Sequence, residues 1–283
     1  MRPTVPATST SHRTTQTAWI DASQLDRLVA SAGSRYGAGV GAAVRNLSDG
    51  KLVESGNLYI GPAWSTLKVP LVMARVRLAE SKRESASDMT AIREAAMSAI
   101  TQSDNYAAAR LFDALESRTG GLLPASRYIQ SQLALGLSTG TQVTTAPPPP
   151  GAFSTWGQTQ WSLDEGTNYF RQLARHCVPT ATGTRLVLSL MQQIVPDQRW
   201  GIGSVTWPGA SVVAFKGGWG PIPAPYLVRQ FGIIETSSGR GVAVGLIAHA
   251  GSFEEGQTVL DRLASAVEHS VRLGAVGPTP LCG

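Results

Sequence analysis

The chain of 283 residues is 42% hydrophobic and 15% charged, which supplies enough apolar material for a large core and argues against a disordered or coiled-coil protein. Its net charge of +5 comes almost entirely from arginine, and the arginines are scattered without interleaved aromatic residues, which argues against nucleic-acid binding. No long uninterrupted apolar run occurs, so the sequence predicts no transmembrane segment.

Both ends of the chain have the composition of connecting segments. Residues 1–17 are rich in Ser, Thr and Pro without hydrophobic periodicity, which predicts a flexible leader. The leader contains no positively charged and apolar signal segment. We therefore expect it to have followed an export signal in a longer chain, and the protein to act outside the cytoplasm, secreted or tethered to the envelope. Residues 275–283 are expected to form a short tail.

The two cysteines, Cys177 and Cys282, exclude a cysteine-rich metal site and leave one possible disulfide. Cys282 lies in the tail, which could reach back to the domain. On the sequence alone, two unpaired thiols are the expectation, with the disulfide as the alternative. His12, His249 and His269 have no partners at metal-ligand spacing, so no metal site is expected. No cofactor is expected either, because the chemistry considered below requires none.

The first half of the chain predicts a helix, two strands and then further helices. Ala22–Ser34 has the periodicity of an amphipathic helix, and Gly39–Arg45 alternates as a strand before a turn and a second strand near Lys51–Ser55. A long apolar helix is expected from Thr66 to Glu80. Three more helices are expected at Met89–Ile100, capped by Ser87 and Asp88, at Asn105–Glu116 and at Ala125–Leu135.

The second half begins with a long loop, Thr139–Gln160, because the consecutive prolines Pro147–Pro150 prevent regular structure. Beyond this loop the sequence predicts two helices, three strands and a closing helix, at Ser162–Arg175, Gly183–Ile194, Ser211–Lys216, Tyr226–Glu235, Gly241–His249 and Phe253–Leu273.

Strands at both ends with helices between them predict an α/β (α+β) fold. In this fold an antiparallel sheet built from both termini is flanked by helices and joined to a helical lobe. We expect one domain over residues 18–274, with an α/β lobe formed by residues 18–60 and 205–274 and a helical lobe formed by residues 61–204.

The segment Ser65-Thr66-Leu67-Lys68 begins the long apolar helix. Residues three apart share a helix face, so we expect the Ser65 hydroxyl and the Lys68 ammonium to lie within hydrogen-bond reach. A lysine desolvated beside another cation can lose its proton near neutral pH and act as a base. The motif is weak alone, because Ser48–Lys51 has the same spacing and is expected to be a hairpin turn.

Two further segments have side chains that could contact a substrate. Ser103-Asp104-Asn105 lies between two helices, where its side chains could cap a helix or contact a substrate. Lys216-Gly217-Gly218 ends a β-branched run, where the lysine could anchor an anion and the glycines could admit a substrate backbone. The alternative for this second segment is a strand that runs into a glycine-rich turn.

Together the three segments resemble the motif set of the class A β-lactamases and penicillin-binding proteins, in which a serine–lysine motif, Ser-Asp-Asn and Lys-Thr-Gly occur in this order. The surrounding sequences WSTLKVPLVMARVRLAE, AITQSDNYAAARLF and WGIGSVTWPGASVVAFKGGWG are also similar to the class A enzymes. The resemblance extends over roughly residues 22–273 and implies a β-lactamase and DD-peptidase-like fold.

The resemblance also implies a role for each matching side chain. Ser65 would attack a carbonyl and become acylated, with Lys68 as the base. Ser103 would pass the proton to the leaving nitrogen, helped electrostatically by Lys216. Asn105 would bind the side-chain amide of the substrate.

On the third motif, Gly217 and Gly218 would lie beside the substrate. The backbone N–H groups of Ser65 and Trp219 would form the oxyanion hole.

The chain departs from the family in three respects. It has no Asp or Glu between Glu116 and Asp164, where class A enzymes have the glutamate that activates the deacylating water. Asp164 and Glu165 are expected to cap a helix instead, so deacylation should be slow. Gly217 also replaces the family's Thr or Ser, whose hydroxyl helps to bind a substrate carboxylate. The short interval between Ser65 and Ser103 implies a trimmed helical lobe and an open cleft.

Three functions follow from these observations. The first is a β-lactamase-like serine hydrolase that forms a slowly deacylated Ser65 acyl-enzyme with β-lactam, peptide or ester substrates. The second is a true class A-type β-lactamase or a D-Ala-D-Ala carboxypeptidase. The third is a non-catalytic envelope protein that binds peptidoglycan. A small-molecule or peptidoglycan-type substrate is expected in the first two cases, and the oligomeric state is not readable.

A rival motif, Gly-x-Ser-x-Gly, occurs at residues 136–140 and is followed by Asp164 and His176 in the order of the α/β-hydrolases. That motif needs a strand before it and a helix after it. Here a helix is expected before it and a proline tract after it, so we reject this interpretation.

Overall fold

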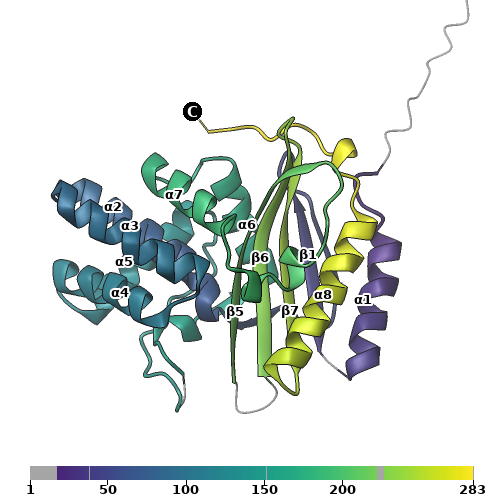
Figure 1. The fold of residues 1–283 in the computed structure, drawn as a ribbon, viewed down its shortest axis with the longest axis horizontal. Helices are drawn as coiled ribbons and strands as arrows, with labels where there is room; N and C mark the ends of the chain where they lie inside the picture. Colours follow the sequence, from purple (N-terminus) through teal and green to yellow (C-terminus); the bar gives the residue numbers. More distant parts are fainter. Residues whose placement is uncertain (1–17, 38, 151, 222–225, 283) are drawn as a thin grey trace, which may run out of the picture.

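The computed structural model describes residues 18–37, 39–150, 152–221 and 226–282, and in it a five-stranded antiparallel sheet lies at the centre of the molecule. The order of the strands is β2-β1-β7-β6-β5. Strands β1 and β2 come from the N-terminal part and the other three from the C-terminal part, so the sheet is built from both ends as expected (Figure 1). Their bounds are β1 Val40–Asn46, β2 Leu52–Gly56, β5 Ala210–Pro221, β6 Tyr226–Thr236 and β7 Gly241–Ala250.

Helices cover both faces of this sheet. The terminal helices α1 (Ala22–Tyr36) and α8 (Phe253–Ser270) lie side by side on one face, and α6 (Leu163–Ala174) packs on the other (Figure 1). Each of these helices buries one apolar stripe, as α1 does with Leu25, Val29 and Ala32. The α+β class predicted from the sequence is confirmed.

The other helices gather beyond β5, the edge strand of the sheet (Figure 1). The helix α2 (Lys68–Lys82) is at the centre of this group, and it is buried along most of its length because other helices of the group surround it. The remaining helices are α3 (Ala86–Thr101), α4 (Asn105–Thr119), α5 (Leu122–Leu135) and α7 (Ala181–Met191).

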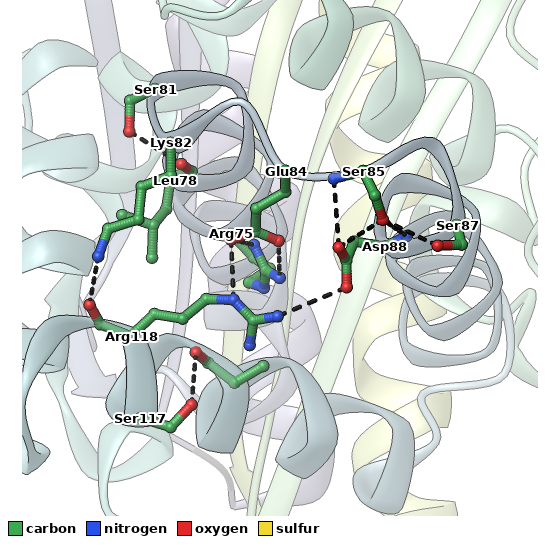
Figure 2. Close-up of polar contacts among 11 residues, drawn as sticks. Arg75, Leu78, Ser81, Lys82, Glu84, Ser85, Ser87, Asp88, Ser117 and Arg118 are labelled. Atoms are coloured by element: carbon green, nitrogen blue, oxygen red, sulfur yellow. Dashed lines mark hydrogen bonds and ion pairs between the residues drawn. The ribbon is translucent and has the colours of Figure 1, made fainter.

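A partly buried ion-pair network joins α2, α3 and α4 (Figure 2). The Arg75 guanidinium donates to both carboxylate oxygens of Glu84, at 3.1 and 2.5 Å, and Arg118 Nε lies 2.8 Å from Glu84 Oε1. Arg118 also reaches Asp88, at 3.6 Å, and Asp88 forms a capping box with Ser85 at the start of α3. We expected Ser87 and Asp88 as the cap. The N-cap is Ser85, because its side chain accepts the Asp88 N–H while the Asp88 carboxylate accepts the Ser85 N–H.

The sequence analysis did not predict two short strands. Strands β3 (Ile60–Pro62) and β4 (Gln160–Ser162) pair with each other in a separate two-stranded sheet. The second of these falls at the end of the segment expected to be a loop, which also contains the short 3-10 helix η2 (Trp156–Gln158). Three residues are too few to show the alternation by which a strand is recognised.

Strand β5 is longer than its β-branched run, because it continues through Lys216, Gly217 and Gly218 to Pro221. The interpretation of the glycines as a turn is therefore wrong. Both glycines are opposed by partner residues of β6, with Gly217 opposite Gln230 and Gly218 opposite Arg229.

The expectation of two unpaired thiols is also wrong. Cys177 and Cys282 form a disulfide between the segment after α6 and the C-terminal tail. The tail is also held by hydrogen bonds, since Cys282 N donates to Arg175 O at 2.9 Å and Arg175 Nε donates to Pro280 O at 2.9 Å. The predicted leader, with His12, lies outside the described residues. Among the described helices, none is both apolar enough and long enough to cross a membrane.

Candidate active site

Ser65 lies on the short 3-10 helix η1 (Trp64–Leu67), which leads directly into α2. This turn packs between β5 on one side and η2 on the other. Trp64, the residue before the serine, has a left-handed backbone with φ 47°, which costs free energy for a residue other than glycine. Ser65 itself is half-buried, so its hydroxyl can be reached from solvent.

Lys68 is the first residue of α2, and its side chain is 1% exposed. Its ammonium donates to Ser103 O at 2.6 Å and to Asn105 Oδ1 at 2.8 Å, and it lies 3.4 Å from Ser103 Oγ. No hydrogen bond joins Lys68 to the Ser65 hydroxyl among the described residues, in contrast to our expectation. The reason is geometric, since the lysine Nζ is directed across the site to the oxygens between α3 and α4.

The helix cap weighed for the Ser103-Asp104-Asn105 segment is present, and the other two residues of the segment have different contacts. Asp104 caps α4, because its Oδ1 accepts the N–H groups of Tyr106 and Ala107 at 2.7 and 3.0 Å. Ser103 and Asn105 instead contact Lys68. Ser103 has a left-handed backbone with φ 56°, which holds both its carbonyl and its hydroxyl toward the lysines.

Lys216 is fully buried in the middle of β5. Its ammonium donates to Ser103 Oγ at 2.9 Å and to the carbonyl of Gly217 at 2.9 Å. Ser103 therefore lies between two lysines that come from elements far apart in the sequence. The structure thus brings Lys68, Ser103 and Lys216 into one hydrogen-bonded chain, with Asn105 beside it.

Both lysines are held in a state that favours the neutral amine. Burial lowers the pKa of Lys68 to about 7, although the negative charge of Asp104 acts in the opposite direction. Burial lowers the pKa of Lys216 well below its ordinary value, and the nearby charge of Lys68 lowers it further. A lysine with a pKa near 7 can accept a proton at neutral pH.

The edge of β5 lies directly against the Ser65 turn. A Cβ atom at Gly218 would lie 2.8 Å from Ala63 O and 3.0 Å from the backbone nitrogens of Ser65 and Thr66. Glycine is therefore required here for the strand to approach the serine so closely. Trp219 follows on the same strand, so its main chain and that of Ser65 flank the same space.

A pocket of about 140 Å³ opens between these elements. Four of the residues named from the sequence for a role at the site line it: Ser65, Ser103, Asn105 and Trp219. The rest of the described wall is formed by Trp64, Phe153, Ser154, Trp156, Gly220, Pro221 and Tyr226. The segment around η2 forms one side of the pocket, although the sequence analysis treated it only as a loop.

The two carboxylates that follow this segment do not belong to the pocket. Asp164 pairs with Arg45, and Glu165 accepts the N–H of Gly140 at 3.1 Å. They lie in the first turn of α6, where acidic side chains stabilise a helix N-terminus. The helix itself is capped by Ser162, whose hydroxyl accepts the Glu165 N–H.

An indole ring occupies the space that a side chain at Gly217 would need. A Cβ atom at Gly217 would lie 2.7 Å from Cη2 of Trp200 and 2.8 Å from its Cζ2. Gln230 fixes this tryptophan, because its Nε2 donates to Trp200 O at 2.7 Å and its Oε1 accepts the Ile202 N–H at 2.7 Å. The sequence analysis identified Gly217 as a departure from the family motif, but it did not predict that the Trp200 ring lies against it.

The rival motif at residues 136–140 is structural. Ser138 is fully buried, lies 3.0 Å from Thr141 Oγ1 and accepts the Trp161 indole N–H at 3.0 Å. The second serine–lysine match, Ser48–Lys51, is the turn between β1 and β2, as expected. In the described part of the chain, no three His, Cys, Asp or Glu side chains gather as metal ligands would.

No protein-family model and no curated protein matches this sequence. The fold, however, matches solved structures of β-lactamases. The TLA-3 extended-spectrum β-lactamase superposes with a TM-score of 0.69 at 14% identity, over 88% of this chain and 98% of that one. A β-lactamase from Sphaerobacter thermophilus gives 0.67 at 17% identity, over 87% and 96%. A representative class A β-lactamase from Bacteroides cellulosilyticus gives 0.66 at 12% identity, over 88% and 97%. The chain therefore has the fold of the class A β-lactamases.

Proposed function

We propose that this chain, on its class A β-lactamase fold, is a serine hydrolase that works through a Ser65 acyl-enzyme. The observation that supports this most is the chain of hydrogen bonds from Lys68 through Ser103 to Lys216 beside a half-buried serine. Two buried lysines without a carboxylate partner are costly to a fold, and this cost is explained if a neutral lysine is needed as a base.

In the proposed reaction the Lys68 amine takes the Ser65 proton as Oγ bonds to the carbonyl carbon of the substrate. In the resting structure Lys68 faces Ser103 and Asn105, so a short shift of its Nζ toward Ser65 would accompany substrate binding. Ser103, which accepts the Lys216 N–H, would hand a proton to the leaving group as the acyl bond breaks. The N–H groups of Ser65 and Trp219 would stabilise the oxyanion, Asn105 would bind a substrate amide, and Gly217 and Gly218 would flank the substrate.

We propose slow deacylation as part of this function. Water must replace Ser65 Oγ on the acyl carbon, and a base must remove a proton from that water. Asp164 and Glu165 are engaged with Arg45 and Gly140, away from the pocket. Lys68 would then have to serve in both steps, so the acyl-enzyme should accumulate.

The reaction would take place outside the cytoplasm. The Cys177–Cys282 disulfide supports this, because disulfides persist mainly in oxidising compartments. We place the catalytic domain at residues 18–274, with the tail held against it by the disulfide.

The test is intact-protein mass spectrometry over time after mixing with penicillin G, a cephalosporin, a carbapenem and p-nitrophenyl acetate. We expect a persistent adduct with at least one of these compounds in the native protein and none in Ser65→Ala. Ser48→Ala is the matched control, since Ser48 begins the other serine–lysine spacing but lies in a hairpin turn. Labelling that survives the loss of Ser65 would contradict the proposal.

A second candidate is a true β-lactamase or D-Ala-D-Ala carboxypeptidase on the same fold. The intact set of Ser65, Lys68, Ser103 and Lys216 favours it, while the engagement of Asp164 and Glu165 elsewhere disfavours rapid turnover. Fast, Ser65-dependent loss of the drug without an adduct would identify this case. A purely binding role would give neither an adduct nor turnover.

A further inference from the structure

The pocket beside Ser65 has aromatic walls and no charged side chain among the described residues that line it. Five of those residues are aromatic, and the remainder are serine, asparagine, glycine and proline: the aromatic residues are Trp64, Phe153, Trp156, Trp219 and Tyr226. A substrate carboxylate is recognised in proteins by cationic or converging N–H donors. The described wall offers no arginine, lysine or histidine for this purpose.

The two nearest cations are directed at protein atoms. Lys216 Nζ donates to Ser103 Oγ and Gly217 O, and Lys68 Nζ donates to Ser103 O and Asn105 Oδ1. Both lysines are buried behind Ser103. An anionic group in the pocket would therefore lose its hydration without gaining an ion pair.

Trp200 occupies the space that a hydroxyl-bearing side chain at Gly217, next to Lys216 on β5, would need. Its ring lies within 2.8 Å of the Cβ position of Gly217, and its own backbone is fixed by Gln230. The ring also packs edge to face with Trp219 and Phe253, at centroid distances of 6.0 and 5.9 Å. This aromatic packing fixes the ring behind the strand that carries Trp219, although the ring itself does not line the pocket.

The mouth of the pocket is also aromatic. Tyr106 is 73% exposed and Phe153 is 47% exposed, and their rings meet edge to face with centroids 5.5 Å apart. Tyr106 follows Asn105 at the start of α4, while Phe153 belongs to the segment before η2. Two large exposed rings that meet beside a pocket favour an apolar ligand that would cover them.

The volume of the pocket limits the size of that ligand. It measures about 140 Å³, and an apolar cavity of about 150 Å³ is known to hold one benzene ring. A single phenyl-sized group therefore fits between the aromatic walls.

We infer that the site is selective for uncharged esters with one phenyl-sized group and discriminates against substrates that bear a carboxylate there. This inference rests on the proposed function and names its substrate class. In each turnover Ser65 Oγ bonds to the acyl carbon, the bond to the alcohol oxygen breaks, and the alcohol leaves with the proton that came from Ser65. Water then releases the carboxylic acid and returns a proton to Ser65.

A pair of esters that differ only in charge tests the selectivity. In m-acetoxybenzamide and m-acetoxybenzoate the ring bears either a neutral amide or a carboxylate of similar size. The kcat/KM of each, divided by its hydroxide-catalysed rate constant, removes the difference in leaving-group reactivity. We expect the amide-bearing ester to be preferred at least tenfold. Equal rates, or a preference for the carboxylate, would overturn the inference.

The aromatic rim gives a second, independent measurement. Phe153→Ala should lower kcat/KM for phenyl acetate about five- to tenfold, the effect of losing one aromatic contact, and should change kcat/KM for vinyl acetate less than twofold. Met97→Ala is the matched control, because Met97 is an exposed apolar residue on α3 that does not line the pocket. Equal losses for the two esters in Phe153→Ala would contradict a ring-binding role.

These outcomes separate the two proposals. Ester hydrolysis that persists in Ser65→Ala would refute the proposed function and with it the inference. No hydrolysis of any of the esters would refute only the inference, because a Ser65 adduct with a β-lactam would still support the proposed function. Hydrolysis that depends on Ser65 but favours m-acetoxybenzoate would leave the proposed function intact and refute only the substrate class.

Discussion

Two buried clusters of charge lie in this molecule, and they are satisfied in opposite ways. Between α2, α3 and α4, Arg75 and Arg118 share the carboxylate of Glu84. At the junction of α2 and β5, Lys68 and Lys216 have only neutral oxygens as partners. In the first cluster each arginine has a carboxylate partner, as expected of ion pairs that hold helices together (Figure 2). The second leaves two amines ready to exchange protons, which is expected of a catalytic site rather than of a stabilising one.

Both clusters include a residue of the helix α2, so the same helix contributes to a salt-bridged cluster and to a cluster without a carboxylate. Lys68 is the first residue of α2, and Arg75 lies about two turns further along. Glu84 follows shortly after the helix ends. The Arg75–Glu84–Arg118 ion pairs therefore stabilise the helix whose first residue is the proposed base. We expect substitutions in these ion pairs to affect stability and substitutions of Lys68 to affect reactivity.

The largest effect on the acylation rate is expected in the cluster of Lys68 and Lys216, which has no carboxylate partner. Lys68→Met should lower the rate of acylation by p-nitrophenyl acetate about 1000-fold, as loss of a general base commonly does. The stability should change by no more than about 1 kcal/mol, because a costly buried amine is lost together with its hydrogen bonds. Burst kinetics and thermal unfolding measure the two quantities. Lys51→Met, in the hairpin turn, is the control and should change neither; a stable Lys68→Met protein with normal acylation would break the comparison.

A substitution in the cluster of Arg75, Glu84 and Arg118 should lower stability and leave acylation nearly unchanged. Glu84→Gln leaves Arg75, whose side chain is 3% exposed, without its counter-ion. Removing one partner of a buried pair costs about 3 kcal/mol or more, so the midpoint of urea unfolding should fall clearly.

The acylation rate of the folded fraction of Glu84→Gln should stay within about twofold of the native rate. Glu94→Gln, an exposed carboxylate on the same helical group, is the control. A loss of acylation as large as that of Lys68→Met would show that the Arg75–Glu84–Arg118 ion pairs are part of the catalytic machinery.

The pH dependence gives the smallest but most specific effect. Burial lowers the pKa of Lys68 to about 7, and the proposed mechanism needs its neutral form. Acylation should therefore be constant well above pH 7 and fall about tenfold per pH unit below it, as the protonated fraction rises. A stopped-flow profile of acylation against pH measures this. A rate that continues to rise through pH 9 would mean that the base has the pKa of an ordinary lysine.

Which residues lie together at the candidate site could be predicted from the sequence, while their contacts could not. Ser65, Ser103 and Lys216 were found because their spacing resembles a known motif set, and the structure gathers all three. The partner of Lys68 was predicted as Ser65 from helical spacing, yet its Nζ reaches Ser103 and Asn105. Helical spacing limits which residues share a face, but the direction of a long side chain depends on which oxygens the neighbouring elements offer.

The fold was predicted in outline because long apolar periodic segments report their own secondary structure. The features that the sequence analysis did not predict are either contacts between residues far apart in the sequence or very short elements. Strands β3 and β4 have three residues each, and the Cys177–Cys282 disulfide joins positions 105 residues apart. Trp200 could not be connected with Gly217, because nothing in the sequence between them records that the ring lies against the strand.

The disulfide also has a topological consequence. It closes a covalent loop that includes β5, β6, β7 and α8, and therefore Lys216, whereas Ser65, Lys68 and Ser103 lie outside the loop. A protease that cuts once within the loop would leave the two fragments linked. Such a nicked molecule would keep all of the proposed catalytic groups on one covalent assembly and run as a single band without reductant. Only reduction would separate the fragment with the nucleophile from the one that ends at the tail.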